Sequence, residues 1–323
     1  MSSLNNLAPI VLFVYNRPSH TEQTLAALKN NDLAKESELF IFCDGPRGEK
    51  DLEMIKQVYQ VIDHVEGFKN VFVKKLSLNK GLAKSVIEGV GEVLNLHGRA
   101  IVLEDDIITS SNFLSFINRA LNFYQDDKKI FSVTGFNYHN YKKPKNYRHD
   151  VFFVSRISSW GWATWKDRWD EVDFKVADYA SIKNDKKIQK EFRKKGDNLF
   201  EMLRKQMLGK IDTWDIQVGW HMFKNKLYCV FPVKTLVKNI GLDSSGTHCH
   251  ADHDMMNFDL KSHEHNFVKF VEATNFISAE NNFLKYTEYS FVKKLISSRK
   301  KRAKPKYIIF GIIIAELLRF LFV

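Results

Sequence analysis

The first hundred residues alternate between apolar runs of strand length and amphipathic stretches, and this rhythm restricts the fold more than any other feature. The apolar runs are PIVLFVY (9–15), LFIFCD (39–44), NVFVKKL (70–76) and AIVL (100–103). Helical patterns lie between them, the first starting near Pro18 and the third ending at Gly98. Strands that alternate with helices predict an α/β fold with a mostly parallel, Rossmann-like sheet flanked by helices.

Three of these strands are followed directly by polar side chains that could bind a ligand. In chain order they are Asn16, Arg17, Asp44, Glu104, Asp105 and Asp106. The carboxyl ends of parallel strands meet at one edge of a sheet, where ligands bind, so we expect these side chains to gather there. A dinucleotide or P-loop site is disfavoured, because no G-x-G-x-x-G follows the first strand and no G-x-x-x-x-G-K-[ST] is present.

The three adjacent acids, Glu104, Asp105 and Asp106, need an explanation of their own. Burying like charges side by side costs several kcal/mol unless something compensates them. They could form a solvated turn. Alternatively, one or two of them could hold Mg²⁺ or Mn²⁺, which keeps positions open for substrate phosphates. Their place at the end of a predicted buried strand favours the metal site.

The length of 323 residues allows one large domain with additions, or two domains, and the 44% hydrophobic content allows a substantial core. The three cysteines, Cys43, Cys229 and Cys249, are widely spaced, which indicates a reducing compartment and no disulfide framework. The first residues lack the basic start and long apolar region of a signal peptide. We therefore expect the chain to stay in the cytosol.

The net charge of +11 is concentrated near the C-terminus. Residues 293–306 hold eight basic side chains and no acid, and without them the charge would fall to +3. Residues 308–323 are apolar except for Glu316 and Arg319. As a helix they would reach about 24 Å, short of the roughly 30 Å hydrocarbon core. We predict a tail that lies on an anionic membrane surface. Packing on the protein's own core is the alternative. Nucleic-acid binding is disfavoured, because the excess charge belongs to a tail.

Several short segments together resemble the GT-A class of glycosyltransferases, and within it the N-acetylglucosaminyltransferase I type. They are IVLEDDIITSSNFLSF, IFSVTGFN (130–137), SSWGWATWKDRW (158–169), TWDIQVGW (213–220) and PVKTLVKNIGLDSSGTH (232–248). Their order covers roughly residues 9–250. The chain lacks the N-terminal anchor of the animal enzymes, so it is similar to a bacterial relative on the cytoplasmic side of the inner membrane.

The resemblance implies an inverting, Mn²⁺- or Mg²⁺-dependent transfer from a nucleotide-sugar, most simply a UDP-sugar, to a glycan or lipid-linked acceptor in surface polysaccharide synthesis. It implies that Asp106 binds the metal and that Glu104 and Asp105 contact the ribose or donor sugar. Asp44 would meet the base, and Asn16 and Arg17 would line the nucleotide pocket. Asp215 would be the general base. A plain helix N-cap is the alternative for Asp215.

Other polar and aromatic segments offer further candidates. Lys84, one turn after Asn79-Lys80-Gly81, could meet a phosphate at a helix N-terminus, and a plainly capped helix is the alternative. His248 could close over the metal or the diphosphate; a zinc site in THCHADHD is disfavoured by its spacing. Candidates for a sugar-stacking platform, with core packing as the alternative, are Trp160, Trp162, Trp165 and Trp214.

These segments predict a glycosyltransferase domain over 1–250, with a nucleotide half over about 1–107 and an acceptor half over about 108–250. A helical or irregular extension over 251–297 and the basic-hydrophobic tail over 298–323 would follow. Two other functions stay open. A sugar-phosphate nucleotidyltransferase usually has a glycine-rich loop after its first strand, where this chain has YNRPSHTEQT. A non-catalytic membrane-surface scaffold would keep the fold without the chemistry.

Overall fold

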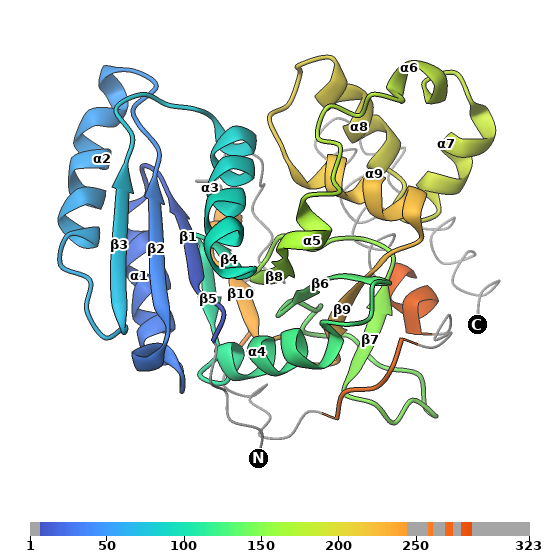
Figure 1. The fold of residues 1–323 in the computed structure, drawn as a ribbon, viewed down its shortest axis with the longest axis horizontal. Coiled ribbons are helices and arrows are strands. Elements are labelled where there is room, and N and C mark those ends of the chain that lie inside the picture. The colour runs from blue at the N-terminus through green and yellow to red at the C-terminus, as the bar shows by residue number, and fades with distance from the viewer. Residues whose placement is uncertain (1–6, 244–257, 261–268, 274–278, 286–323) are drawn as a thin grey trace, which may run out of the picture.

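A central sheet of eight strands runs through the computed structural model, which describes residues 7–243, 258–260, 269–273 and 279–285 (Figure 1). The strand order is β3-β2-β1-β4-β8-β6-β9-β7. Four of the seven pairings are parallel, and three of those four join β1 to β4 in one continuous half of the sheet. The α/β class predicted from the sequence is confirmed.

The parallel half follows from the alternation of apolar runs and helices. Its strands are β1 (Ile10–Val14), β2 (Glu38–Cys43), β3 (Asn70–Lys75) and β4 (Arg99–Glu104). The helices between them are α1 (Pro18–Lys29), α2 (Glu49–Ile62) and α3 (Leu82–His97), with the short η1 (Ala34–Glu36) before β2. Figure 1 shows α3 over one face of the sheet and α1 with α2 over the other, because the chain turns back from β3 to add β4 beside β1.

The second half of the sheet mixes strand directions. Its strands are β6 (Ile130–Thr134), β7 (Val151–Val154), β8 (Trp162–Trp165) and β9 (Tyr228–Pro232). Helix α4 (Phe113–Tyr124) packs against β6 and β8, and the short strands β5 (Ile107–Thr109) and β10 (Val237–Asn239) form a separate ribbon. One continuous hydrophobic core joins both halves. A short helical stretch over 279–285 packs against it.

Four helices form a small subdomain beside the main sheet, at the upper right of Figure 1. They are α6 (Tyr179–Ile182), α7 (Lys186–Arg193), α8 (Leu199–Met207) and α9 (Asp215–Asn225). Their apolar faces meet in a second core that includes Phe192, Leu203 and Trp220. The loop over 208–214, between α8 and α9, faces the parallel half of the sheet (Figure 1). We call residues 176–225 the helical subdomain.

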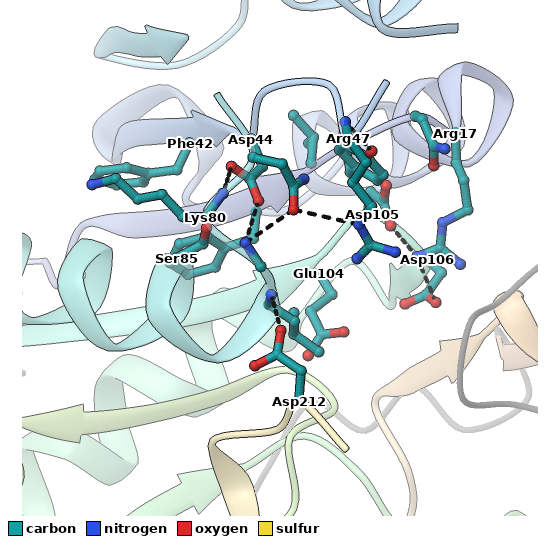
Figure 2. A pocket seen from close by; sticks show the side chains of 17 residues that line it. Arg17, Phe42, Asp44, Arg47, Lys80, Ser85, Glu104, Asp105, Asp106 and Asp212 are labelled. Atoms are coloured by element: carbon teal, nitrogen blue, oxygen red, sulfur yellow. Dashed lines mark hydrogen bonds and ion pairs between the residues drawn. The ribbon is translucent and has the colours of Figure 1, made fainter. Parts of the chain in front are cut away.

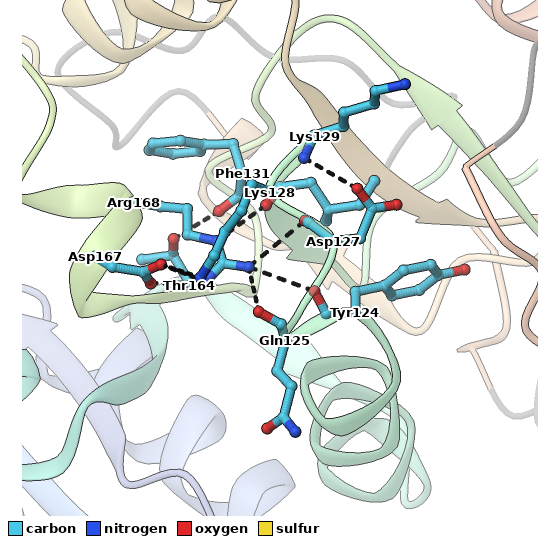
Figure 3. A network of polar contacts seen from close by, with 10 residues as sticks. Tyr124, Gln125, Asp127, Lys128, Lys129, Phe131, Thr164, Asp167 and Arg168 are labelled. Carbon is cyan, nitrogen blue, oxygen red and sulfur yellow. Dashed lines mark hydrogen bonds and ion pairs between the residues drawn. The ribbon is translucent and has the colours of Figure 1, made fainter.

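The buried side chain of Arg168 connects three elements in the second half of the sheet. Arg168, in the short helix α5 (Lys166–Trp169), is 5% exposed and lies over the ring of Trp165 at 4.4 Å. It also pairs with Asp167 at 2.6 Å (Figure 3). Its guanidinium group also donates to main-chain carbonyls, those of Tyr124, Gln125, Asp127 and Ile130. Because a guanidinium carries five donors in a fixed plane, this one side chain ties the end of α4 and the start of β6 to α5.

The C-terminal predictions lie largely outside the described residues. The basic-hydrophobic tail over 298–323 and most of the extension over 251–297 belong there. Within the part of the chain that the structure describes, no helix combines the length and the apolar character needed to cross a bilayer.

Candidate active site

A cavity of about 550 Å³ opens at the edge where β1, β2 and β4 end and α3 begins (Figure 2). The sequence-predicted residues that line it are Asn16, Arg17, Asp44, Glu104, Asp105 and Asp106. They come from three different strands and meet because parallel strands present their carboxyl ends at one edge. The structure therefore has these polar side chains together at one edge of the sheet, as we expected from the strand order.

Arg17 is the ion-pair partner of two acids in the turn at the end of β4. Asp105 and Asp106 are 3% and 6% exposed, and Arg17 forms ion pairs with both, the one to Asp106 at 2.9 Å. Burial alone would lower the pKa of Arg17, but the two carboxylates raise it above its usual value. Arg17 therefore stays charged and holds together two acids that would otherwise repel each other.

Two acids of the turn, Glu104 and Asp105, have pKa values raised toward their neutral forms. Burial raises the pKa of Glu104 to about 8, with further contributions from the charges of Asp106 and Asp105. Burial also raises the pKa of Asp105 to about 6, although Arg17 opposes that shift. When these acids ionise, their charges together exceed that of Arg17, which is the electrostatic condition of a cation site.

One carboxylate oxygen of this turn is free to bind a cation. Asp106 Oδ1 is buried and has no hydrogen-bond partner among the described residues, while Asp106 Oδ2 faces Arg17. The main chain of 240–241 packs against the turn: Ile240 N donates to Asp106 O at 2.9 Å. A Cβ atom at Gly241 would lie 2.2 Å from Asp106 Oδ2, so any other residue there would force the Asp106 carboxylate to move.

The residues present fit a hard cation held partly by its substrate. The described residues contain no group of three or more His, Cys, Asp or Glu side chains placed to hold a metal ion. Mg²⁺ and Mn²⁺ commonly take one or two protein carboxylates and complete their shell with phosphate oxygens and water. Asp106 suits that arrangement. The other predicted ligand, His248, lies outside the described residues.

Asp44 holds the loop between β3 and α3 against the cavity. Its carboxylate accepts hydrogen bonds from the main-chain N–H groups of Gly45, Lys80 and Gly81 at 3.0, 2.9 and 3.1 Å. The loop comes so close that a Cβ atom at Gly45 would lie 2.5 Å from the main chain of Leu78. Asp44 thus lines the cavity, but most of its acceptor capacity is used within the protein, and its contact with a base stays a prediction.

The structure does not have the predicted phosphate contact of Lys84 and the N-terminus of α3. The N–H groups of Lys80 and Gly81 are taken by Asp44, and Leu82 N donates to Asp212 Oδ2 at 2.7 Å. Lys84 does not line the cavity; its side chain is 63% exposed and lies 3.8 Å from Glu88. One residue further on is a rotation of about 100° around a helix, and it is Ser85 that faces the cavity.

The sequence analysis did not single out Tyr15 and Arg47, which line the cavity near the end of β1. Tyr15 donates to Asp51 Oδ2 at 2.6 Å, and Asn16 donates to Asp51 Oδ1 at 3.0 Å. The guanidinium of Arg47 lies 5.4 Å from the centre of the Tyr15 ring. Arg47 follows β2 in a polar turn, and that position at the carboxyl end of a strand is the signal that could have identified it.

The predicted tryptophan platform is mostly hydrophobic core, which corrects that expectation. Trp162 and Trp214 are 1% and 2% exposed, and their rings stack on each other with centroids 4.7 Å apart. Trp165 is 5% exposed beneath Arg168. Large apolar ring surfaces gain most from complete burial, so these faces are not accessible to a sugar. Trp160 is partly buried, edge-on to Phe136 at 4.6 Å.

Asp215 is the first residue of α9 and is partly exposed. The N-cap position belongs to Trp214, and it makes no side-chain cap, so Asp215 does not have the N-cap role of the alternative interpretation. Asp215 accepts a hydrogen bond from the hydroxyl of Thr213. It lies outside the cavity lining, yet its charge is near enough to contribute to the raised pKa of Glu104.

No family model and no curated protein matches the chain. The crystal structure of S. aureus TarS is similar with a TM-score of 0.34 and 12% identity, over 51% of this chain and 30% of that one. TarS 1–349 in complex with UDP-GlcNAc gives a TM-score of 0.33 and 14% identity, over 52% and 50%.

A third similar structure is the mannosyltransferase PcManGT from Pyrobaculum calidifontis in complex with GDP-Man and Mn²⁺. Its TM-score is 0.33 and its identity 9%, over 51% of this chain and 46% of that one. This chain thus spans half or less of these neighbours' lengths. The fold and the cavity define a class, an α/β protein with a polar cavity at the carboxyl edge of a parallel half-sheet. The functional assignment rests on the geometry of that cavity.

Proposed function

We propose that this protein is a metal-dependent glycosyltransferase that uses a nucleotide-sugar donor, most simply a UDP-sugar. The observation that carries the proposal is the acidic turn of Glu104, Asp105 and Asp106, set in a strand-edge cavity. One buried oxygen of Asp106 there has no hydrogen-bond partner in the part of the chain that the structure describes. A cavity of about 550 Å³ is also of the size that small-molecule ligands occupy.

The charge of the cavity explains why a metal would be needed. Among the residues that the structure describes, five carboxylates and three basic side chains line it, so a bare diphosphate would be repelled. Asp106 would hold Mn²⁺ or Mg²⁺ through its free oxygen. When bound, the ion supplies positive charge that stabilises the departing nucleoside diphosphate. Arg17, in contact with both Asp105 and Asp106, would add a fixed positive charge beside it.

The nucleoside would lie between the ends of β1 and β2 and the first turn of α3. Phe13, Tyr15 and Phe42 give this part of the cavity apolar and aromatic walls that suit a base. Ser85 Oγ is buried there without a hydrogen-bond partner among the described residues, and a ligand donor or acceptor would satisfy it. Arg47, exposed at the cavity, would meet the negative charge of the ligand.

Asp215 would act as the general base of an inverting reaction. Its carboxylate would take the proton of the acceptor hydroxyl while that oxygen bonds to the anomeric carbon of the donor and the bond from that carbon to the phosphate oxygen breaks. The position of Asp215 supports this role, because it begins α9 close enough to Glu104 for its charge to act on that carboxyl group. The resemblance of TWDIQVGW to the N-acetylglucosaminyltransferase I type supports the same role.

The acceptor would be a glycan or a lipid-linked oligosaccharide at the cytoplasmic side of the inner membrane. This part of the proposal is supported by the sequence alone: the basic run over 293–306 and the apolar residues over 308–323 suit an anionic membrane surface. Surface polysaccharide synthesis is a process that would use an enzyme held in that plane.

Incubation of the purified protein with Mn²⁺ and a panel of nucleotide-sugars tests the proposed activity. Nucleoside diphosphate release should occur with one donor, should stop with EDTA, and should be lost in Asp106→Ala and Asp215→Asn. Wild-type inactivity with every donor, together with no thermal shift on adding UDP, would refute it. Pyrophosphate release from UTP and a sugar phosphate would instead identify a nucleotidyltransferase. Activity in cells that survives Asp106→Ala would identify a scaffold.

A further inference from the structure

Asp212 connects the helical subdomain to the nucleotide half across the cavity. It lies in the 208–214 loop, and its Oδ2 accepts a hydrogen bond from Leu82 N at 2.7 Å, although the two residues are 130 positions apart (Figure 2). Leu82 N is one of the N–H groups that a helix leaves without an internal partner at its start. The contact therefore satisfies α3 while it fixes the loop.

The glycine at position 81 makes room for this contact. Gly81, directly before α3, has φ of +83°, and a Cβ atom there would lie 2.6 Å from Asp212 Oδ2. A side chain at this position would displace the carboxylate, and the positive φ is one that glycine adopts without strain. The close approach of Asp212 to α3 thus depends on a glycine at the position where the chain has one.

Each residue after Asp212 ties the same loop to a different element. Thr213 N donates to Gln206 Oε1 of α8 at 3.0 Å, and the Thr213 hydroxyl donates to Asp215. Trp214 is buried in the main core against Trp162. Asp212 is the residue of this run that reaches the nucleotide half, and it lies three positions before Asp215.

We infer that Asp212 is a positioning residue that holds Asp215 at the correct distance from a donor bound in the cavity. The inference rests on the proposed function, in which Asp215 is the base. Asp212 itself moves no proton in this scheme; its hydrogen bond to Leu82 sets where the loop, and with it the start of α9, lies against α3. A reacting group that is misplaced by about 1 Å can lose a factor of about 100 in rate.

The role predicts a kinetic pattern that separates it from donor binding. Without the hydrogen bond from Leu82 N to Asp212, the 208–214 loop can move. The rate of the chemical step should then fall, while the nucleoside site at the ends of β1 and β2 stays intact. An amide oxygen can accept the same hydrogen bond as a carboxylate, so Asp212→Asn should keep the tether. The matched control is Asp197→Ala, which removes an exposed carboxylate of the same subdomain outside the cavity.

The experiment measures kcat, the donor KM and UDP affinity for D212A, D212N and D197A, with hydrogen–deuterium exchange of each full chain. D212A should lower kcat by about 10- to 100-fold. Its KM and UDP affinity should stay within about 3-fold. D212N and D197A should behave like the wild type. Exchange should quicken in D212A at the start of α3 and over 208–214, and there alone.

Three results would overturn the inference. One is a D212A enzyme as active as D197A. A second is a D212N enzyme as impaired as D212A, which would assign a role to the charge and not to the hydrogen bond. A third is tighter UDP binding by D212A, which would make Asp212 a competitor of the ligand. Wild-type inactivity with every donor would instead overturn the proposed function, and the exchange data would still decide whether the tether exists.

Discussion

Removing Arg17 tests the electrostatics of the cavity most severely, because it leaves two buried carboxylates with no cation between them. Breaking a buried ion pair by deleting one partner typically destabilises a protein by 3–5 kcal/mol. The Arg17 side chain is 20% exposed and those of Asp105 and Asp106 are 5% and 9% exposed, so we expect the low end of that range, about 3 kcal/mol. Arg47→Ala is the matched control, since Arg47 is exposed at the same cavity.

The assay is urea unfolding of Arg17→Ala and Arg47→Ala with and without Mn²⁺. Arg47→Ala should cost less than about 1 kcal/mol. In Arg17→Ala the ion should return a large part of the lost stability, because a divalent cation replaces the missing charge beside Asp106. Its stabilising effect should be smaller in the wild type, where Arg17 already neutralises part of the site.

Acid should also rescue the Arg17→Ala variant. Burial already raises the pKa of Asp105 to about 6 in the presence of Arg17, and loss of that cation raises it further. A carboxyl group with a raised pKa in the folded state destabilises the fold once it ionises, so stability should increase as the pH falls from about 8 to about 5. An Arg17→Ala protein as stable as Arg47→Ala, or one indifferent to both Mn²⁺ and acid, would refute this reasoning.

Three further predictions concern the packing of the fold and of the site. Arg168→Ala should lower the free energy of unfolding by about 3 kcal/mol or more in urea titrations, and Arg168→Lys should not restore it, because a lysine lacks the planar set of donors. Gly241→Ala should weaken Mn²⁺-dependent UDP binding in calorimetry while the far-ultraviolet circular dichroism stays unchanged, since its Cβ would lie 2.2 Å from Asp106 Oδ2; unaltered affinity would contradict the close approach. Trp214→Ala should cost about 3–5 kcal/mol of stability, as expected of a core residue stacked on Trp162, and a loss confined to acceptor KM would restore the sugar-platform interpretation.

The parallel half of the fold was predictable because its signals are local. Each buried strand is an apolar run, each helix has its own periodicity, and the right-handed connection between parallel strands leaves little freedom in how they assemble. The meeting of Arg17, Asp44 and Asp106 followed from strand ends alone. The mixed directions of β6 to β9 were less accessible, because antiparallel pairing there depends on contacts between segments about 30 to 80 residues apart.

The errors in the site have a common physical origin. Lys84 and Ser85 are adjacent in sequence, but one residue turns a helix by about 100°, and only the start of α3 at Leu82 decides which of them faces the cavity. Trp162 and Trp214 are as suited to a core as to a sugar platform, and only their mutual stacking settles the matter. No local sequence pattern indicated the role of Asp212, because its hydrogen-bond partner Leu82 is 130 residues away.

Calorimetric titration of UDP into the wild type and Asp106→Asn, each with Mn²⁺ and with EDTA, tests the central claim most directly. The asparagine keeps the size of the side chain and removes the charge that would hold the ion. UDP should bind the wild type at least tenfold more tightly with Mn²⁺ than with EDTA, a difference of about 1.4 kcal/mol. Asp106→Asn should lose that difference. Equal UDP affinity in the presence of Mn²⁺ and EDTA, or an Asp106→Asn protein that keeps the full metal effect, would contradict the account.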